Sequence, residues 1–192
     1  MERRDVLAEL ATDYVLEHGV IGLSLRPLAA ALDTSDRMLL YHFANKDALV
    51  AEVIGRSNAR SLAVLRQLPR ASSVAAGVLA LWRAMSDPQL DRCQRVYTQA
   101  AALGLLGQEP YRDVVRASNA EWSKAVATYL TSCGATAARS VRIARFVDAT
   151  IMGLHLDLSV ETPVGVGKAV RDLAAAAQRI SDGDQSVRAE SG

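Results

Sequence analysis

The chain has 192 residues, half of them hydrophobic and 22% charged, with 22 Lys and Arg against 21 Asp and Glu. This composition is typical of a globular protein with a real hydrophobic core, and it excludes a disordered chain. The two cysteines, Cys93 and Cys133, lie 40 positions apart, which excludes a disulfide scaffold or a zinc cluster and favours a reducing cytoplasm. Unbroken apolar runs such as residues 100–107 are too short to span a bilayer, and we expect no signal peptide.

Abundant alanine and scarce aromatic residues favour an all-α fold of about nine helices. Helix breakers and capping residues place the boundaries between them. The first eight predicted helices cover about residues 3–18, 25–32, 36–42, 45–68, 72–87, 89–106, 111–133 and 136–160. The last follows Pro163 and Gly165 and ends near Ile180.

The composition changes after Pro69, so we place a domain boundary between residues 45 and 70, bridged by the fourth helix. We predict one helical domain over residues 1–50 and a larger helical domain over residues 51–182. The polar tail at 183–192 is predicted to be disordered. Residues 1–70 hold nine basic and nine acidic side chains, so any DNA binding must rest on local placement of charge.

The first fifty residues have the pattern of a helix-turn-helix domain, with a short turn at residues 33–35 between the second and third helices. Leu28 and Leu39 belong to the apolar stripes of these two helices. Ser24 is a good N-cap for the second helix, with Pro27 in the first turn, and Thr34 or Ser35 can cap the third.

These residues also carry a resemblance to a known family. Residues 22–29 (GLSLRPLA), the turn, and residues 39–49 (LLYHFANKDAL) resemble the DNA-binding domain of TetR-family regulators, over about residues 3–55. The resemblance implies a dimeric regulator that responds to a ligand. It assigns DNA binding to the domain at residues 1–50, and ligand binding and dimerisation to the domain at residues 51–182. The chain departs from the family pattern at the turn, where Asp33-Thr34-Ser35 replaces the usual Gly-Val-Ser. It departs again at Arg37 and Leu40, where a small residue and a tyrosine are usual. Asp33 tolerates the left-handed conformation that a turn glycine would adopt.

The motif suggests which side chains contact DNA. An isolated Arg26 or Arg37 would be read as a solvated arginine, but at these positions each can bind guanine or phosphate. Lys46 lies in the first turn of its helix, where a cation opposes the helix dipole, and a phosphate docked at that N-terminus would explain this position. Asp36 either accepts from a cytosine or stabilises the start of its helix, and we favour the second reading. The predicted DNA-binding residues are Ser24, Arg26, Ser35, Arg37, Tyr41, His42 and Lys46.

The remainder of the chain contains no catalytic or metal-binding constellation, so we expect neither an enzyme nor a cofactor. Large adaptable side chains inside apolar helices could be ordinary core, but as a group they resemble the lining of a pocket for a small hydrophobic or aromatic ligand. The predicted ligand-binding residues are Trp82, Met85, Tyr97, Trp122, Met152 and His155. Gln99 and Asn119 could add polar contacts. Asp148 and Asp157 either face solvent or meet a cationic ligand.

Apolar residues recur at intervals of three and four along the last two helices, which predicts a homodimer through a four-helix bundle. The predicted interface residues are Val147, Ile151, Leu154, Leu158, Val170, Leu173 and Ala177. Two functions stay open. The first is a cytoplasmic regulator, most simply a repressor that a small organic ligand releases from a palindromic operator in double-stranded DNA. The second is a ligand-binding module of the same fold without specific operator binding.

Overall fold

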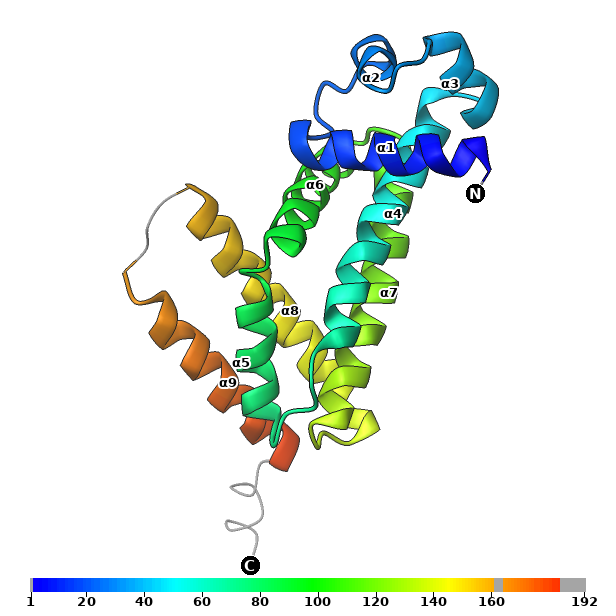
Figure 1. Cartoon of the computed structure of the whole chain (residues 1–192). Coiled ribbons are helices and arrows are strands. Elements are labelled where there is room, and N and C mark those ends of the chain that lie inside the picture. The colour runs from blue at the N-terminus through cyan, green and yellow to red at the C-terminus, as the bar shows by residue number, and fades with distance from the viewer. Residues whose placement is uncertain (1, 161–163, 184–192) are drawn as a thin grey trace, which may run out of the picture. The chain divides into compact units, whose positions relative to one another are not determined.

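The computed structural model describes residues 2–160 and 164–183, so the predicted tail at 183–192 lies outside the described residues except for Gly183. This part of the chain contains nine helices and no strand, which confirms the all-α prediction (Figure 1). The helices are α1 (Arg3–His18), α2 (Leu25–Ala31), α3 (Asp36–Phe43), α4 (Lys46–Gln67), α5 (Val74–Ala84), α6 (Pro88–Leu105), α7 (Tyr111–Ser132), α8 (Ala137–Val160) and α9 (Val166–Asp182).

Side-chain caps explain why three of these helices begin where they do. Ser35 Oγ accepts from the backbone N–H of Met38 at 3.2 Å, and Asn45 Oδ1 accepts from Ala48 at 2.7 Å. Ser73 Oγ accepts from Ala76 at 3.1 Å in the same way. Each bond satisfies an N–H group that the helix itself leaves without an acceptor.

The predicted cap at Ser24 is not formed: the side chain of Ser24 makes no capping hydrogen bond to α2. A capping oxygen accepts from the second or third residue of a helix, and the third residue of α2 is Pro27, which has no N–H. The turn that follows α2 agrees with the sequence analysis. Asp33 has a φ of 49°, the left-handed conformation expected for the residue that replaces a glycine there.

The contacts divide the chain into two compact units. The first unit contains Met1–Ala63 and Pro88–Ala120, and the second contains Val64–Asp87 and Glu121–Gly192. This division differs from a boundary at residue 50, because α6 packs against α1 and so joins the first unit. The functional division at residue 50 therefore stays a prediction.

The core of the first unit joins the helix-turn-helix to helices that lie far along the chain. Leu7 and Val15 of α1, Leu28 of α2 and Leu39 of α3 are almost fully buried in one cluster. Val96 of α6 belongs to the same cluster. Burying aliphatic side chains of this size stabilises a fold by about 1.5–3 kcal/mol each.

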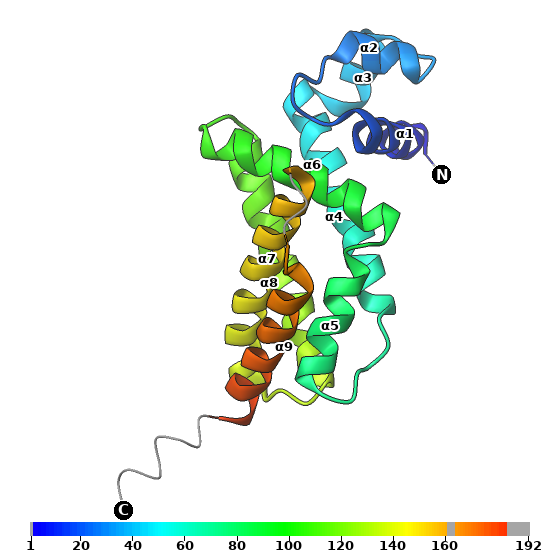
Figure 2. The ribbon, with the colours of Figure 1, turned by 90° about the vertical axis from the view of Figure 1, so that its left-hand side faces the viewer.

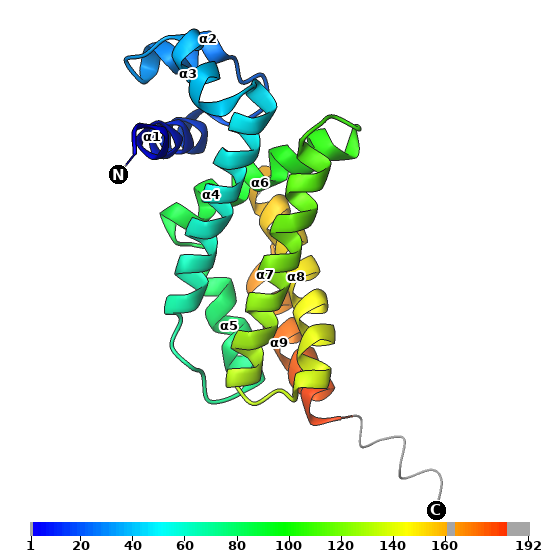
Figure 3. The ribbon, with the colours of Figure 1, turned by 90° about the vertical axis from the view of Figure 1, so that its right-hand side faces the viewer.

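The second unit is a helical bundle formed by α5, α8, α9 and the C-terminal half of α7. Helix α9 packs along both α5 and α8 (Figure 2). Gln178 of α9 also accepts from the backbone N–H of Ala75 at 3.0 Å, near the start of α5. A short turn at Gly134 connects α7 to α8, which run side by side in this unit (Figure 3). None of the described helices combines the length and apolar character that a membrane span requires.

Candidate DNA-binding and ligand-binding sites

Helix α3 has one buried face and one exposed face. Leu39 and Phe43, four residues apart, lie in the core of the first unit. Arg37 and Tyr41 have the same spacing on the other side of the helix and are exposed, Tyr41 by 78%. The Tyr41 ring makes an edge contact with His42, their centroids 5.1 Å apart. A helix with this division can lie on the domain core and still present a cation and a phenol to a partner.

The other predicted DNA-binding side chains are also accessible. Ser24, Arg26 and Lys46 are exposed, at or near the starts of α2 and α4, and His42 is half-buried. Helix starts carry free backbone N–H groups and a partial positive charge, so they suit phosphate oxygens. The hydroxyl of Ser35 is already used as a cap for α3.

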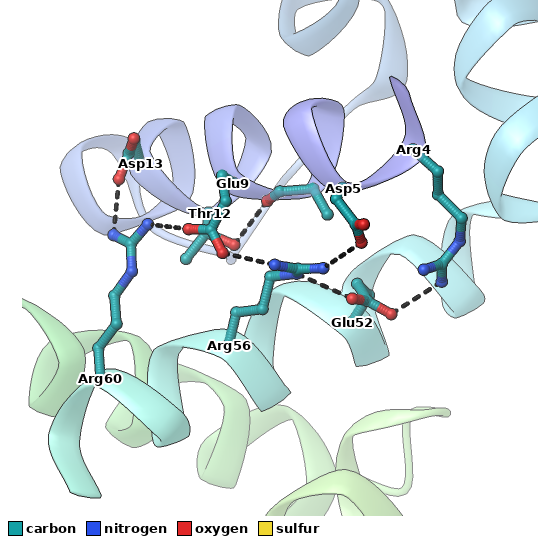
Figure 4. A network of polar contacts seen from close by, with 9 residues as sticks. Arg4, Asp5, Glu9, Thr12, Asp13, Glu52, Arg56 and Arg60 are labelled. Carbon is teal, nitrogen blue, oxygen red and sulfur yellow. Dashed lines mark hydrogen bonds and ion pairs between the residues drawn. The ribbon is translucent and has the colours of Figure 1, made fainter. Parts of the chain in front are cut away.

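An ion-pair network joins α1 to the first-unit part of α4 (Figure 4). Arg56 of α4 donates to Asp5 and Glu9 of α1 and to Glu52 one turn earlier. Two further arginines share these carboxylates. Arg60 donates to Glu9 and also to Asp13, and Arg4 donates to Glu52. The network holds the N-terminal helix against the helix that begins at Lys46.

The network changes the acidity of its carboxyl groups. A hydrogen bond from Arg60, supported by Arg56, lowers the pKa of Glu9 although partial burial opposes the shift. Burial alone would raise the pKa of Glu52, but hydrogen bonds from Arg4 and Arg56 outweigh it and lower that pKa. Both carboxylates are therefore stabilised in their charged form. Sequence reasoning missed this network because the i, i+4 spacing of Glu52 and Arg56 was its only local signal.

Gln99 has a different role from the ligand contact that the sequence suggested. Its Oε1 accepts from the backbone N–H groups of Val20 at 2.8 Å and Ile21 at 3.1 Å, so it provides the hydrogen-bond acceptor for two N–H groups of the loop between α1 and α2. Gly19 lies directly against it. A Cβ atom at Gly19 would come within 2.6 Å of Gln99 Oε1.

The predicted ligand-binding residues do not all fall in one unit. Tyr97 lies on α6 in the first unit, whereas the other five belong to the second. In the second unit Met85 is buried and follows α5, and Trp82 is half-buried on α5. Met152 and His155 of α8 and Trp122 of α7 are also half-buried.

One contact in the second unit links a predicted ligand-binding residue to a carboxylate. Trp122 Nε1 donates to Asp148 Oδ1 at 2.8 Å, which joins α7 to α8. Burial raises the pKa of Asp148, and the indole N–H bond opposes that shift without cancelling it. For Asp157, as for Asp148, the sequence left open whether the side chain faces solvent or a cationic ligand, and Asp157 is exposed. Asp148 is therefore partly removed from water, and Asp157 is exposed to it.

The structure corrects the predicted dimer surface. Among the seven predicted interface residues, Val147, Ile151, Val170, Leu173 and Ala177 are buried inside the chain itself. Helical periodicity finds an apolar face but does not say what covers it, and these faces of α8 and α9 cover their own unit. Of the two remaining residues, Leu154 is half-buried and Leu158 is 43% exposed.

Helix α8 also has an exposed seam at intervals of three and four residues. The seam consists of Phe146, Ala149, Gly153, Leu156 and Val160. Among the described residues, apart from its own turn of helix, nothing lies within 4 Å of a Cβ built at Gly153. This spacing is the one by which helices of two subunits pack together.

Comparison with protein families matches residues 9–53 to the bacterial regulatory proteins of the tetR family. Comparison with curated proteins gives no match. The fold, in contrast, resembles several solved structures over nearly the whole chain. A transcriptional regulator from Rhodococcus sp. Rha1 has a TM-score of 0.71 at 19% identity, covering 95% of this chain and 99% of that one.

Two further solved structures carry ligands. The multidrug binding protein EbrR in complex with ethidium has a TM-score of 0.65 at 25% identity, covering 92% of this chain and 99% of that one. A protein from Saccharomonospora viridis assigned as a transcriptional regulator, in complex with choline, has a TM-score of 0.64 at 18% identity. It covers 90% of this chain and 93% of that one.

Proposed function

Because the chain belongs to the TetR family of bacterial regulatory proteins, we propose that it is a cytoplasmic repressor that binds a palindromic operator as a homodimer. A small organic ligand then releases it from the DNA. The observation that carries this proposal is the exposed face of α3, where Arg37 and Tyr41 stand opposite a buried face in a helix-turn-helix unit.

In the proposed complex, α3 of each subunit enters a major groove. Arg37 and Tyr41 contact base edges, and Arg26 of α2 assists them. Ser24, His42 and Lys46 bind phosphates. Because the Ser24 hydroxyl makes no capping hydrogen bond to α2, no such bond has to break for it to bind a phosphate. Two-fold symmetry places the half-site centres about 34–36 Å apart, or a multiple of one helical turn.

Base contacts and phosphate contacts can be separated by mutation. Arg37→Ala should cost about 1–3 kcal/mol on the preferred operator and relax its sequence preference. Lys46→Ala should weaken all duplexes alike and reduce the salt slope by about one charge. Selection from a genomic library followed by binding titrations over a salt series measures both effects.

The matched control for these variants is Lys124→Ala, which removes an exposed cation from α7 in the second unit and should change neither quantity. The repressor proposal is wrong if selection enriches no palindrome. In that case any retention of the wild-type protein on heparin at low salt measures only nonspecific electrostatic binding. The chain is then better described as a ligand-binding module without a specific operator.

The exposed seam of α8 is the proposed contact between subunits. Phe146, Leu156 and Val160 supply apolar area, and Ala149 and Gly153 permit close approach of the two helices. The polar outer face of α9, which includes Arg171, Asp172 and Arg179, would border this contact. A closed two-fold arrangement of α8 and α9 gives the four-helix bundle expected from the sequence, with a different face of α8 at its centre.

Gly153→Arg should convert the dimer into a monomer. Replacing a helical glycine by arginine improves helix propensity by up to about 1 kcal/mol, so the variant is expected to fold. Light scattering at micromolar concentration measures the mass. Leu105→Arg, at a residue 86% exposed on α6, is the control that should leave the mass unchanged. A wild-type monomer, or a dimeric Gly153→Arg variant, would contradict this interface.

The effector site is proposed to lie in the second unit, among Trp82, Met85, Trp122, Met152 and His155. The solved structures with ethidium and choline show that this fold accommodates small organic ligands in other proteins. A ligand changes DNA affinity only through a difference in its own affinity for two arrangements of the protein. A coupling of about 1–3 kcal/mol corresponds to a change of about 5–150-fold in operator affinity.

A further inference from the structure

Asp148 occupies an unusual place for a carboxylate. It lies near the middle of α8 on the stripe that also carries Met152 and His155, at spacings of four and seven residues. This stripe borders the buried face formed by Ala144 and Ile151. Asp148 is half-buried, and one of its oxygens is held by the indole N–H of Trp122 at 2.8 Å.

The charge of Asp148 has no cationic partner within the described part of the chain. Its one hydrogen bond there comes from a neutral indole, and no Lys, Arg or His forms an ion pair with it. Glu9 and Glu52, which are also partly buried, are each held by two arginines. Carboxylates removed from water are normally paired, because desolvation of an unpaired charge is costly. Such an exception is a candidate for a functional group.

We propose that Asp148 and Trp122 form the recognition point for an organic cation with an apolar body. The ligand's ammonium or iminium group supplies the charge that Asp148 lacks. The Trp122 N–H orients the carboxylate, and the indole ring and the Met152 thioether contact the apolar part. The inference rests on the effector site proposed above and names its ligand class, and it disfavours carboxylate or phosphate ligands.

The test uses two probes of nearly equal shape that differ in charge, (4-hydroxyphenyl)trimethylammonium and 4-tert-butylphenol. Ethidium and proflavin serve as larger cationic probes. Isothermal titration of the full chain without DNA should show that the small cation binds about tenfold or more tightly than its neutral isostere, as expected for a desolvated ion pair.

Asp148→Asn keeps an oxygen that can accept the Trp122 N–H bond but removes the charge. In this variant the preference for the cation should disappear, and ethidium and proflavin should bind about tenfold or more weakly. Asp157→Asn makes the same change of charge at an exposed position on the same helix and should leave all affinities unchanged. Thermal melting shows whether each variant is folded.

Three results would overturn the proposal. These are equal affinity of the wild-type protein for the two isosteres, equal effects of Asp148→Asn and Asp157→Asn, or no binding of any cationic probe. The isostere comparison needs no variant, so it stands even if Asp148→Asn does not fold. Because these measurements contain no DNA, their failure leaves operator binding untouched. Failure to find an operator would equally leave the cation site standing.

Discussion

Arg56→Met should lower the free energy of unfolding by about 2 kcal/mol, because it leaves three carboxylates without a shared guanidinium. Arg56 donates to Asp5, Glu9 and Glu52, and its side chain is only 23% exposed. Methionine retains most of the apolar stem, so the loss measures the ion pairs more than the packing. Urea unfolding at neutral pH is the measurement.

The control for this prediction is an ion pair of the ordinary surface kind in the same unit. Arg116 and Asp113 lie 3.3 Å apart on α7 with side chains 74% and 71% exposed. Arg116→Met should change stability by less than about 0.5 kcal/mol. Equal effects of the two substitutions would show that the network adds nothing beyond isolated surface pairs.

The same network predicts how stability responds to acid. The folded pKa values of Glu9 and Glu52 lie below the ordinary value of 4.5. The network's contribution is therefore present above pH 4.5 and is lost as the pH falls through the lowered values. The difference in stability between wild type and Arg56→Met should narrow over that range. A constant difference down to acidic pH would assign the effect to packing.

Gly19→Ala should be strongly destabilising, by about 2–3 kcal/mol, from backbone strain and a steric clash together. Gly19 has a φ of +83°, which costs an alanine about 1–2 kcal/mol. The new methyl group would also lie 2.6 Å from Gln99 Oε1, and displacing that oxygen removes the acceptor of the Val20 and Ile21 N–H groups.

Gly22→Ala separates these two contributions. Gly22 has a similar φ of +73°, but in the described part of the chain nothing beyond its sequence neighbours lies within 4 Å of its Cβ position. It should show the strain alone, and the excess loss in Gly19→Ala measures the clash with Gln99. The double variant Gly19→Ala, Gln99→Ala should be less destabilised than the sum of the single variants. If Gly19→Ala costs no more than Gly22→Ala, Gln99 does not hold this loop.

The sequence by itself determined the all-α fold and most of the helix ends, because the signals for these features are local. Asn45 and Ser73 cap the helices whose starts were predicted at about residues 45 and 72, since a cap needs only an N–H group three residues away. Asp33 adopts the left-handed turn for the same local reason. The exposed and buried faces of α3 also followed from the spacing of its apolar residues, because that spacing indicates which side of the helix packs against the core.

The tertiary structure decided which surface covers each apolar face and which partner each polar group finds. Helix α8 has apolar residues on several sides, and periodicity alone assigned Val147 and Ile151 to a partner subunit although they cover their own core. Gln99 and Arg56 find acceptors or donors 47 to 79 residues away along the chain. The sequence left Asp148 open between solvent and a ligand, and only the tertiary structure shows that it is half-buried beside Trp122. Burial and pairing depend on which distant segments fold together, and no local pattern contains that information.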